Sequence, residues 1–355
     1  MRFYQLIRPL IFLFKEETAH NLAIKRLRHL PVFKRRKSDK VLKNKICNIS
    51  FKNPVGMAAG FDKNCDTLNK LFNYNFGFVE FGTVTPRPQI GNEMPRIFRL
   101  HKDQAIINAL GFNNLGINYF LTNICQVSRK NVFGINIGKN KHSNSDDYLQ
   151  LMQKTYGHSN YITINISSPN TKGLRDLQER DQLDLFLTKI ADQKRQLFNK
   201  KRKNVPIFLK IAPDLTVKDQ KDIAILAKRH KIDGLIISNT TISRPKSLKS
   251  PNQNIKGGLS GRPLFELSTQ VLANFYQLTK GQIPLIGVGG ISNADDAYKK
   301  IRMGASLIQI YSAFIYQGFD LVNEINDGLA KRIRADGYKK ISQVIGLDAK
   351  KYARL

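Results

Sequence analysis

The chain has 355 residues, 41% of them hydrophobic, so it can bury a large core and is longer than most single domains other than α/β barrels. Its three cysteines, Cys47, Cys65 and Cys125, are odd in number and form no Cys-x-x-Cys pair, which argues against a disulfide framework or a zinc site and favours a reducing compartment. The 58 basic residues exceed the 27 acidic residues by 31, an excess that attracts nucleic acid, anionic lipid or small acidic substrates alike.

The N-terminal segment has two apolar stretches of different character. Residues 3–14 are almost wholly apolar, yet they are far shorter than the roughly 20 residues that span a bilayer, and no signal-peptide cleavage site follows them. Residues 16–30 repeat apolar side chains at helical spacing with basic ones opposite, until Pro31 ends the pattern. The segment therefore predicts two short helices, either an interfacial membrane anchor or a pair packed on the main domain.

A basic run overlaps the second of these helices. It contains one acid, Asp39, and the following basic residues: Lys25, Arg26, Arg28, Lys34, Arg35, Arg36, Lys37, Lys40, Lys43 and Lys45. Taken alone, such a run is a solvated linker; next to apolar helices it is also suited to an anionic membrane surface.

From residue 46 onward, short apolar runs alternate with helix-length connections. The runs lie at 54–60, 76–82, 132–138, 161–167, 206–212, 233–239, 284–290 and 306–312. Continuous apolar strands with helical connections predict a parallel sheet covered by helices, and eight units favour a closed (β/α)8 TIM barrel. The rival, a doubly wound open sheet, is disfavoured because the glycine cluster at 287–292 lacks the third glycine of a dinucleotide fingerprint. We expect residues 1–45 to form a helical extension with a basic linker, and residues 46–355 to form the barrel.

Polar or small residues follow nearly every predicted strand, at the rim where α/β barrels carry their chemistry. One half of this rim is rich in exposed backbone amides that suit a phosphate: Gly258, Gly261, Gly289, Gly290, Tyr311 and Ser312. The other half offers amides and lysines, which complement a cyclic imide and an anion: Lys63, Asn108, Asn136, Asn165, Asn170, Lys210 and Asn239. The sequence shows no catalytic carboxylate pair, zinc ligand set or Ser-His-Asp triad, and we expect no metal.

Longer motifs carry a family resemblance. They are NPVGMAAGFDKN (53–64), GTVTPRPQIGNEMPRIFRL (82–100), GFNNLG (111–116), GINIGKNK (134–141), INISSPNTKGLRDLQ (164–178), LKIAPD (209–214), SNTT (238–241), GGLSGRPL (257–264), IGVGGI (286–291) and GASLIQIYS (304–312). In order and spacing, over about residues 2–335, the chain resembles the class 2, quinone-reducing dihydroorotate dehydrogenases. The resemblance implies an FMN-containing barrel that oxidises dihydroorotate to orotate in pyrimidine biosynthesis and reduces a membrane quinone.

The resemblance also implies roles for individual residues. Ser168 would be the base that takes the C5 proton while a hydride leaves C6 for FMN, with Thr171 and ordered water as a proton relay. The implied substrate residues are Lys63, Asn108, Ala109, Leu110, Gly111, Phe112, Asn165, Asn170, Asn239 and Thr240. The implied FMN residues are Ala59, Gly60, Phe61, Asp62, Lys63, Thr83, Asn136, Asn165, Lys210, Ser238, Gly261, Gly290, Tyr311 and Ser312.

Two features imply class 2 rather than class 1, which has cysteine at the base position and lacks the N-terminal helices. Position 168 is serine, and the apolar helices are present. His20 and Arg99 match positions that line the quinone entrance of the family. The basic run would face anionic headgroups, which implies a peripheral membrane protein, on the cytoplasmic face of the inner membrane in a bacterium.

One loop departs from the family, and other functions remain open. Asn108-Ala109-Leu110 replaces the usual bacterial Asn-Arg-Met, so the loop can pack differently near the flavin and quinone. An FMN barrel with a soluble electron acceptor and a flavin-free phosphate-binding lyase or isomerase would share this fold. A nucleic-acid-binding protein is disfavoured because no nucleic-acid module is recognisable.

Overall fold

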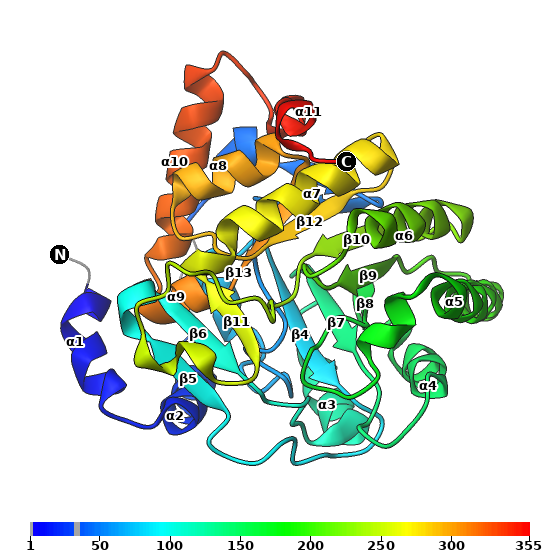
Figure 1. Cartoon of the computed structure of the whole chain (residues 1–355), viewed down its shortest axis with the longest axis horizontal. Helices are drawn as coiled ribbons and strands as arrows, with labels where there is room; N and C mark the ends of the chain where they lie inside the picture. The colour runs from blue at the N-terminus through cyan, green and yellow to red at the C-terminus, as the bar shows by residue number, and fades with distance from the viewer. Residues whose placement is uncertain (1–2, 32–35) are drawn as a thin grey trace.

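Eight parallel strands close into a barrel in the computed structural model, which describes residues 3–31 and 36–355 (Figure 1). In spatial order from β3 these strands are β3 (Val55–Met57), β4 (Phe78–Val84), β7 (Phe133–Ile137), β8 (Tyr161–Asn165), β9 (Ile207–Ile211), β10 (Gly234–Ile237), β12 (Leu285–Val288) and β13 (Ala305–Ile310). Each of them overlaps one of the eight apolar runs of the sequence, although β4 ends two residues after its run and β13 begins one residue before its run. The predicted TIM barrel is therefore confirmed.

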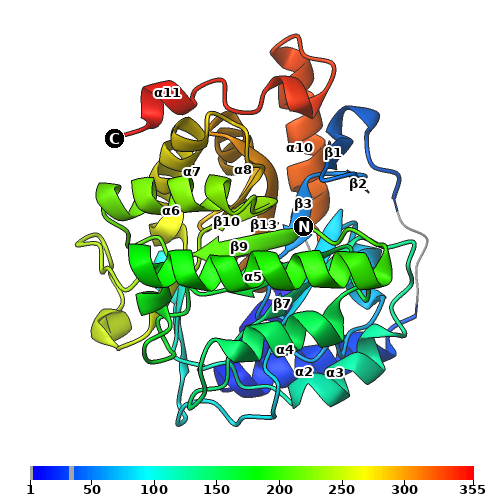
Figure 2. The ribbon, with the colours of Figure 1, turned by 90° about the vertical axis from the view of Figure 1, so that its right-hand side faces the viewer.

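Helices cover the outside of the barrel, so the strands are buried on both faces and read as unbroken apolar runs. Their bounds are α3 (Gly116–Ile124), α4 (Asp146–Thr155), α5 (Arg180–Lys201), α6 (Val217–Arg229), α7 (Phe265–Thr279), α8 (Ala294–Arg302), α9 (Ser312–Gln317), α10 (Leu321–Ala335) and α11 (Ala349–Tyr352). Figure 2 shows α4, α5 and α6 lying side by side in this outer layer. Local chemistry sets their ends: α6 begins at a capping box in which Thr216 and Asp219 bond reciprocally.

A two-stranded hairpin closes the N-terminal end of the barrel. Strands β1 (Asn44–Ile46) and β2 (Ile49–Phe51) pair antiparallel and place Ile46 and Phe51 against aromatic residues inside the barrel. Phe51 meets Phe78 edge to face with 5.4 Å between ring centroids. The sequence pattern did not reveal this hairpin. The predicted domain boundary between residues 45 and 46 lies within β1. The division of the chain into an extension and a barrel stays a prediction.

A second small sheet lies over the other end of the barrel and also escaped the sequence analysis. It has the order β11–β6–β5, from β5 (Ile97–Leu100), β6 (Ala105–Asn108) and β11 (Gly258–Gly261), all antiparallel. Strand β11 passes close to Thr240, and this requires glycine at position 258, because a Cβ there would lie 1.9 Å from the Thr240 hydroxyl. The sheet carries Asn108 to the rim.

The two N-terminal helices, α1 (Phe3–Phe12) and α2 (Glu16–His29), lie beside this small sheet (Figure 1). Pro9 lies within α1 without ending it. Five large apolar side chains remain exposed on this pair and the turn between them, namely Leu6, Leu10, Leu13, Phe14 and Leu22. In the described ranges, no helix is both long and apolar enough to cross a membrane.

Some side chains of the basic run form ion pairs with acidic residues elsewhere in the chain. Arg28 pairs with Asp66 and Arg36 with Asp327, so both side chains join this segment to the barrel. Lys34 and Arg35 lie outside the described residues.

Candidate active site

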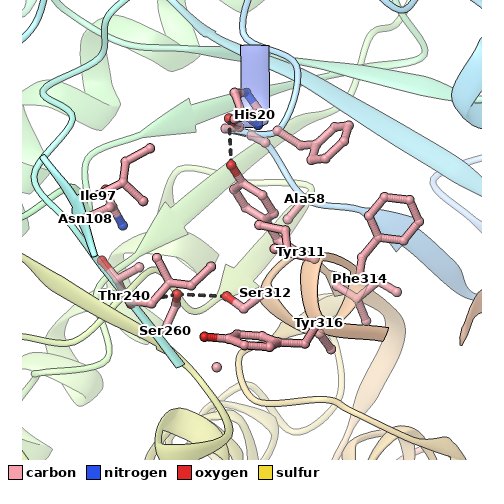
Figure 3. Close-up of a pocket in the computed structure, with 18 of the residues that line it drawn as sticks. His20, Ala58, Ile97, Asn108, Thr240, Ser260, Tyr311, Ser312, Phe314 and Tyr316 are labelled. Atoms are coloured by element: carbon pink, nitrogen blue, oxygen red, sulfur yellow. Dashed lines mark hydrogen bonds between the residues drawn. The ribbon is translucent and has the colours of Figure 1, made fainter. Parts of the chain in front are cut away.

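A cavity of about 430 Å³ opens at the C-terminal ends of the barrel strands and continues between α1 and α2. Most of the residues predicted for the site line it: Ala59, Gly60, Phe61, Lys63, Thr83, Asn108, Leu110, Gly111, Phe112, Asn165, Ser168, Asn170, Lys210, Ser238, Asn239, Thr240, Gly261, Gly290, Tyr311 and Ser312, with His20 and Arg99. Figure 3 shows Asn108 and Thr240 on one side of this cavity and Tyr311 and Ser312 on the other. Its volume is typical of a site for a cofactor or small ligand.

Four predicted site residues, Asp62, Ala109, Asn136 and Thr171, are not among the lining residues. The carboxylate of Asp62 is turned into its own loop, where it accepts hydrogen bonds from Asp66 N, Thr67 N and the Thr67 hydroxyl. Asn136 is fully buried behind Thr83 and Asn165. Ala109 contributes a carbonyl that accepts from Asn92 Nδ2 at 2.9 Å. Thr171 has a buried hydroxyl with no partner among the described residues.

Asn165, the amide inside strand β8, is part of a hydrogen-bonded chain at the rim. Its Nδ2 donates to the Thr83 hydroxyl at 3.1 Å and to Asn136 Oδ1 at 3.2 Å. Its Oδ1 accepts from the Ser167 hydroxyl at 2.7 Å, and Asn239 Nδ2 donates to that hydroxyl at 2.9 Å. These bonds fix the orientation of two amides that line the cavity.

Ser168 follows in the loop after β8 and is 6% exposed. Its hydroxyl accepts a 3.3 Å hydrogen bond from Asn170 N, and the described residues bring no histidine or carboxylate into hydrogen-bond contact with it. Asn170 in turn donates to the carbonyl and the side-chain oxygen of Asn108, at 3.0 and 3.2 Å. The loop is thereby tied to the small sheet across the cavity.

Two lysines bring positive charge into the cavity. Burial lowers the pKa of Lys63 to about 8, and the nearby Glu17 carboxylate partly opposes that shift. Burial also lowers the pKa of Lys210, on β9, and the charge of Glu80 opposes it. Both groups are desolvated cations that an anionic ligand would stabilise.

The glycine-rich part of the rim is open to a phosphate. Gly290 has φ +75°, and a Cβ there would lie 2.4 Å from Phe265, so this position requires glycine. Ser312 donates from its hydroxyl to Ser260 at 2.8 Å, as Figure 3 shows. Backbone amides and hydroxyls therefore converge without a carboxylate among them, which suits a bound phosphate.

The sequence analysis missed several residues of this site. Ser260 and Gln309 line the cavity, and Gln309 Oε1 is buried without a partner among the described residues. Glu80 is fully buried beneath the cavity and accepts from Asn136 Nδ2 at 2.7 Å. The available signal was a lone carboxylate within an otherwise apolar strand.

The end of the cavity between α1 and α2 is largely apolar, with Ile7, Ile11, Ala23 and Leu30 among its lining residues. Arg99 donates to the carbonyls of Phe12 and Phe14 at 3.0 and 3.2 Å and lies over the Phe12 ring. Burial lowers the pKa of His20 to about 3, so its ring is neutral at physiological pH. This end suits an apolar ligand with a few polar atoms.

Helix α2 is joined to the rim by an ion pair between a buried arginine and a half-buried glutamate. Arg96 donates from Nε and Nη2 to Glu17 at 2.9 and 2.6 Å, and from Nη1 to the carbonyls of Ile90 and Asn92. Asn92 Nδ2 then donates to the carbonyls of Ala109 and Asn170. A continuous set of bonds thus joins α2 to the loop that carries Asn170.

The described parts of the chain contain no group of three or more His, Cys, Asp or Glu residues arranged to hold a metal ion.

Comparison with known proteins gives the same family throughout. A family model described as dihydroorotate dehydrogenase matches residues 41–333. The dihydroorotate dehydrogenase (quinone) of Rhodospirillum rubrum is 47% identical over 348 residues, covering 97% of this chain and 94% of that protein. The enzyme of the same name from Bradyrhizobium sp. strain ORS 278 is 45% identical over 351 residues, which cover 98% of this chain and 96% of that protein. The crystal structure of Eimeria tenella DHODH in complex with ferulenol superposes with a TM-score of 0.89 at 40% identity, covering 94% of this chain and 95% of that one.

We expect Glu17→Gln to loosen the loop at residues 89–96, because it leaves the buried Arg96 without its counter-charge. Losing one partner of such a pair costs about 3 kcal/mol of local stability, so amide hydrogen exchange in this loop should become about a hundredfold faster. The adjacent Glu16→Gln is the control, since Glu16 makes no bond to Arg96. Equal exchange rates in the two variants would contradict the role of the pair.

Proposed function

The chain belongs to the dihydroorotate dehydrogenase family, and from this we propose that it oxidises (S)-dihydroorotate to orotate and passes the electrons to a quinone. The reaction oxidises a CH–CH bond and would serve pyrimidine biosynthesis. The observation that carries the proposal is one cavity with two kinds of wall. It is polar where the barrel strands end and apolar between α1 and α2, so a polar imide and a quinone can each reach the same interior.

The family depends on a flavin, and we propose FMN for this chain. Three groups suit the pyrimidine end of a flavin ring: Gln309 Oε1, which has no partner among the described residues, the cation of Lys210 and the amide of Asn165. The glycine-rich part of the rim suits its phosphate, with Gly261, Gly290, Tyr311 and Ser312 as the proposed ligands. The remaining contacts would come from Ala59, Gly60, Phe61, Thr83 and Ser238, and from Asn136 through Thr83 and Asn165. Bound in this way, FMN would supply an acceptor for the hydride from C6 of the substrate and a two-electron donor for the quinone.

The substrate would lie against the loop after β8. Lys63 would pair with its carboxylate, and the amides of Asn108, Asn170 and Asn239 would meet the imide edge together with Thr240. The bonds from Asn170 to Asn108 support this arrangement, because they hold two of these groups together across the cavity. Leu110, Gly111 and Phe112 would complete the wall.

Ser168 would remove the proton from C5. A free hydroxyl is a weak base at neutral pH, so the proton needs a route away from the site. The buried hydroxyl of Thr171, which has no partner in the described ranges, lies in the same loop, and water between the two hydroxyls would complete a relay. Lys63 and the surrounding amides would stabilise the negative charge that develops.

The quinone would enter between α1 and α2, past His20 and Arg99. A neutral His20 and the apolar lining support entry of an uncharged, apolar ring. The exposed leucines of these helices and the basic residues nearby support peripheral attachment to an anionic membrane surface, on the cytoplasmic side of the inner membrane if the source is bacterial.

Replacement of Ser168 by alanine should leave FMN bound but slow flavin reduction by dihydroorotate about a thousandfold, because the C5 proton loses its acceptor. The measurement is anaerobic bleaching of the flavin band, followed by its recovery on addition of a short-chain quinone. Ser167→Ala is the matched control and should cost no more than about thirtyfold, since it removes two hydrogen bonds of about 1 kcal/mol each, to Asn165 and from Asn239. An unmodified holoenzyme that dihydroorotate fails to bleach would overturn the proposed function.

The affinity for orotate should fall as the pH rises through about 8 in the unmodified protein. Lys63 carries its charge below the pKa of about 8 and loses it above, so the carboxylate of the ligand then loses its partner. Spectral titration between pH 6 and pH 9 should show a decline that approaches about tenfold per pH unit above the pKa. Lys63→Met should bind weakly at every pH; a flat profile for the unmodified protein would count against this role.

Membrane attachment can be tested with the exposed leucines of the first helix and its turn. The double variant Leu10→Ser, Leu13→Ser should bind anionic phosphatidylglycerol vesicles at least about tenfold more weakly in co-sedimentation, since each buried leucine contributes about 2 kcal/mol. Leu185 is also exposed but lies on α5, so Leu185→Ser should bind as the unmodified protein does. Attachment would be refuted if the unmodified protein stayed in the supernatant.

A further inference from the structure

Glu80 is a fully buried carboxylate inside the barrel, beneath the cavity. Its Oε1 accepts from Asn136 Nδ2 at 2.7 Å, and its Oε2 accepts from Gln309 Nε2 at 2.9 Å. The hydroxyls of Tyr161 and Thr163 each donate to Oε2 at 3.1 Å. The donors come from β7, β8 and β13, so one side chain on β4 joins four strands of the barrel. Such an arrangement suits an ionised carboxylate, which only accepts hydrogen bonds.

This carboxylate fixes the direction of the hydrogen bonds above it. Because it cannot donate, Asn136 must turn its Nδ2 toward Glu80 and its Oδ1 toward the rim. That oxygen accepts from the Thr83 hydroxyl at 2.6 Å and from Asn165 Nδ2. Asn165 must then present its own Oδ1 to Ser167. A glutamine at position 80 could donate as well as accept hydrogen bonds. The side-chain amides of Asn136 and Asn165 would then no longer be restricted to one orientation.

Glu80 also balances the charge of Lys210. Lys210 lies on β9 opposite Asn165 in the register of the sheet, is 5% exposed, and lines the cavity. No hydrogen bond from its ammonium group to another described residue compensates for its desolvation. Glu80 is the charge that favours its protonated form.

We propose that Glu80 is a positioning residue of this enzyme: it sets the direction in which Asn136 and Asn165 face the cofactor and keeps Lys210 charged beside it. The proposal deepens the proposed function and rests on it, since it requires a flavin in the cavity. Without touching the flavin, Glu80 would act on it through these three neighbours. A charged Lys210 would stabilise the negative charge that arrives with an electron pair.

Other titratable groups lie around Glu80 and Lys210. Tyr161 on β8 contacts Glu80 directly, and burial raises the pKa of its hydroxyl further above neutrality, so it remains a donor. The other ionisable side chains that line the cavity from the surrounding elements are Tyr4, Glu16, His20, Arg26, Lys63, Arg99, Arg262, Tyr311 and Tyr316. Among the described residues, Glu80 is the charged group that opposes the effect of burial on the pKa of Lys210.

The test is the pH dependence of the two-electron reduction potential of the bound flavin in Glu80→Gln, set with dithionite and redox dyes. Without the Glu80 charge, Lys210 should lose its proton at lower pH in the oxidised enzyme and regain it on reduction. Above that pH, reduction should take up one additional proton for each electron pair, so the potential should fall more steeply as the pH rises. We expect this break in slope to lie about one pH unit or more below its position in the unmodified holoenzyme.

Thr163→Val is the matched control. It removes one of the four hydrogen bonds to the same carboxylate but keeps its charge and its bond to Asn136. The break in slope should stay in place, and the affinity for orotate should change less than about threefold. In Glu80→Gln, orotate should bind at least about tenfold more weakly because the amide chain is no longer oriented. Equal effects of the two variants would show that Glu80 merely packs the barrel, which overturns the proposal.

Glu80→Asp keeps the charge but withdraws the carboxylate by one methylene group, beyond reach of Asn136. It should weaken orotate binding as Glu80→Gln does while leaving the break in slope in place. This variant still decides the matter if Glu80→Gln fails to retain flavin: a shifted break or unchanged orotate binding would overturn the proposal. The potential does not involve dihydroorotate, so an unmodified flavoprotein that dihydroorotate fails to bleach would refute the proposed function without deciding the role of Glu80.

Discussion

The buried carboxylate of Glu80 and its four donors are the interaction on which the site depends. A closed barrel must fill its interior with side chains, and here the lower part is filled by aromatic rings such as Phe78 and Phe208. Above them, the polar layer around Glu80 replaces apolar packing. A charge in this position is tolerable because side chains of β7, β8 and β13 donate four hydrogen bonds to it. The amides of the rim stand directly on that layer.

Arginines connect the loops above the strands by hydrogen bonds, just as Glu80 connects the strands themselves. Arg175 donates to the carbonyls of Ser167 and Thr240 and pairs with Asp214, which joins the loops after β8, β9 and β10. Arg96 does the same between α2 and the loop at residues 89–96. Because guanidinium groups offer five donors in a fixed plane, each can orient several carbonyls at once. These hydrogen bonds fix the loops that carry Ser168, Asn170 and Thr240 relative to one another.

The cavity changes character along its length, and this follows from which elements form each end. The inner end is made of strand termini, whose side chains are amides, lysines and hydroxyls. The outer end is made of two helices whose inner sides are apolar and whose outer sides keep several leucines exposed. A barrel alone would provide only the polar end. The helical pair adds an apolar route into the same space, which is what a family that couples dihydroorotate to quinone requires.

The sequence by itself determined the eight barrel strands, because β-branched runs of strand length, bounded by glycine and proline, report local burial. Its motifs also brought Ser168, Asn165, Lys63 and Lys210 into one predicted site through family resemblance. The tertiary structure decided which groups actually face the cavity. In the folded chain the Asp62 carboxylate accepts hydrogen bonds within its own loop, and Asn136 lies beneath the cavity in contact with Glu80. Strands β5, β6 and β11 pair into the small sheet. The tertiary structure also gave Glu80 its partners, which lie 56 to 229 residues away in the chain. Periodicity encodes whether a residue is buried, whereas pairing between such distant side chains arises only when the barrel closes.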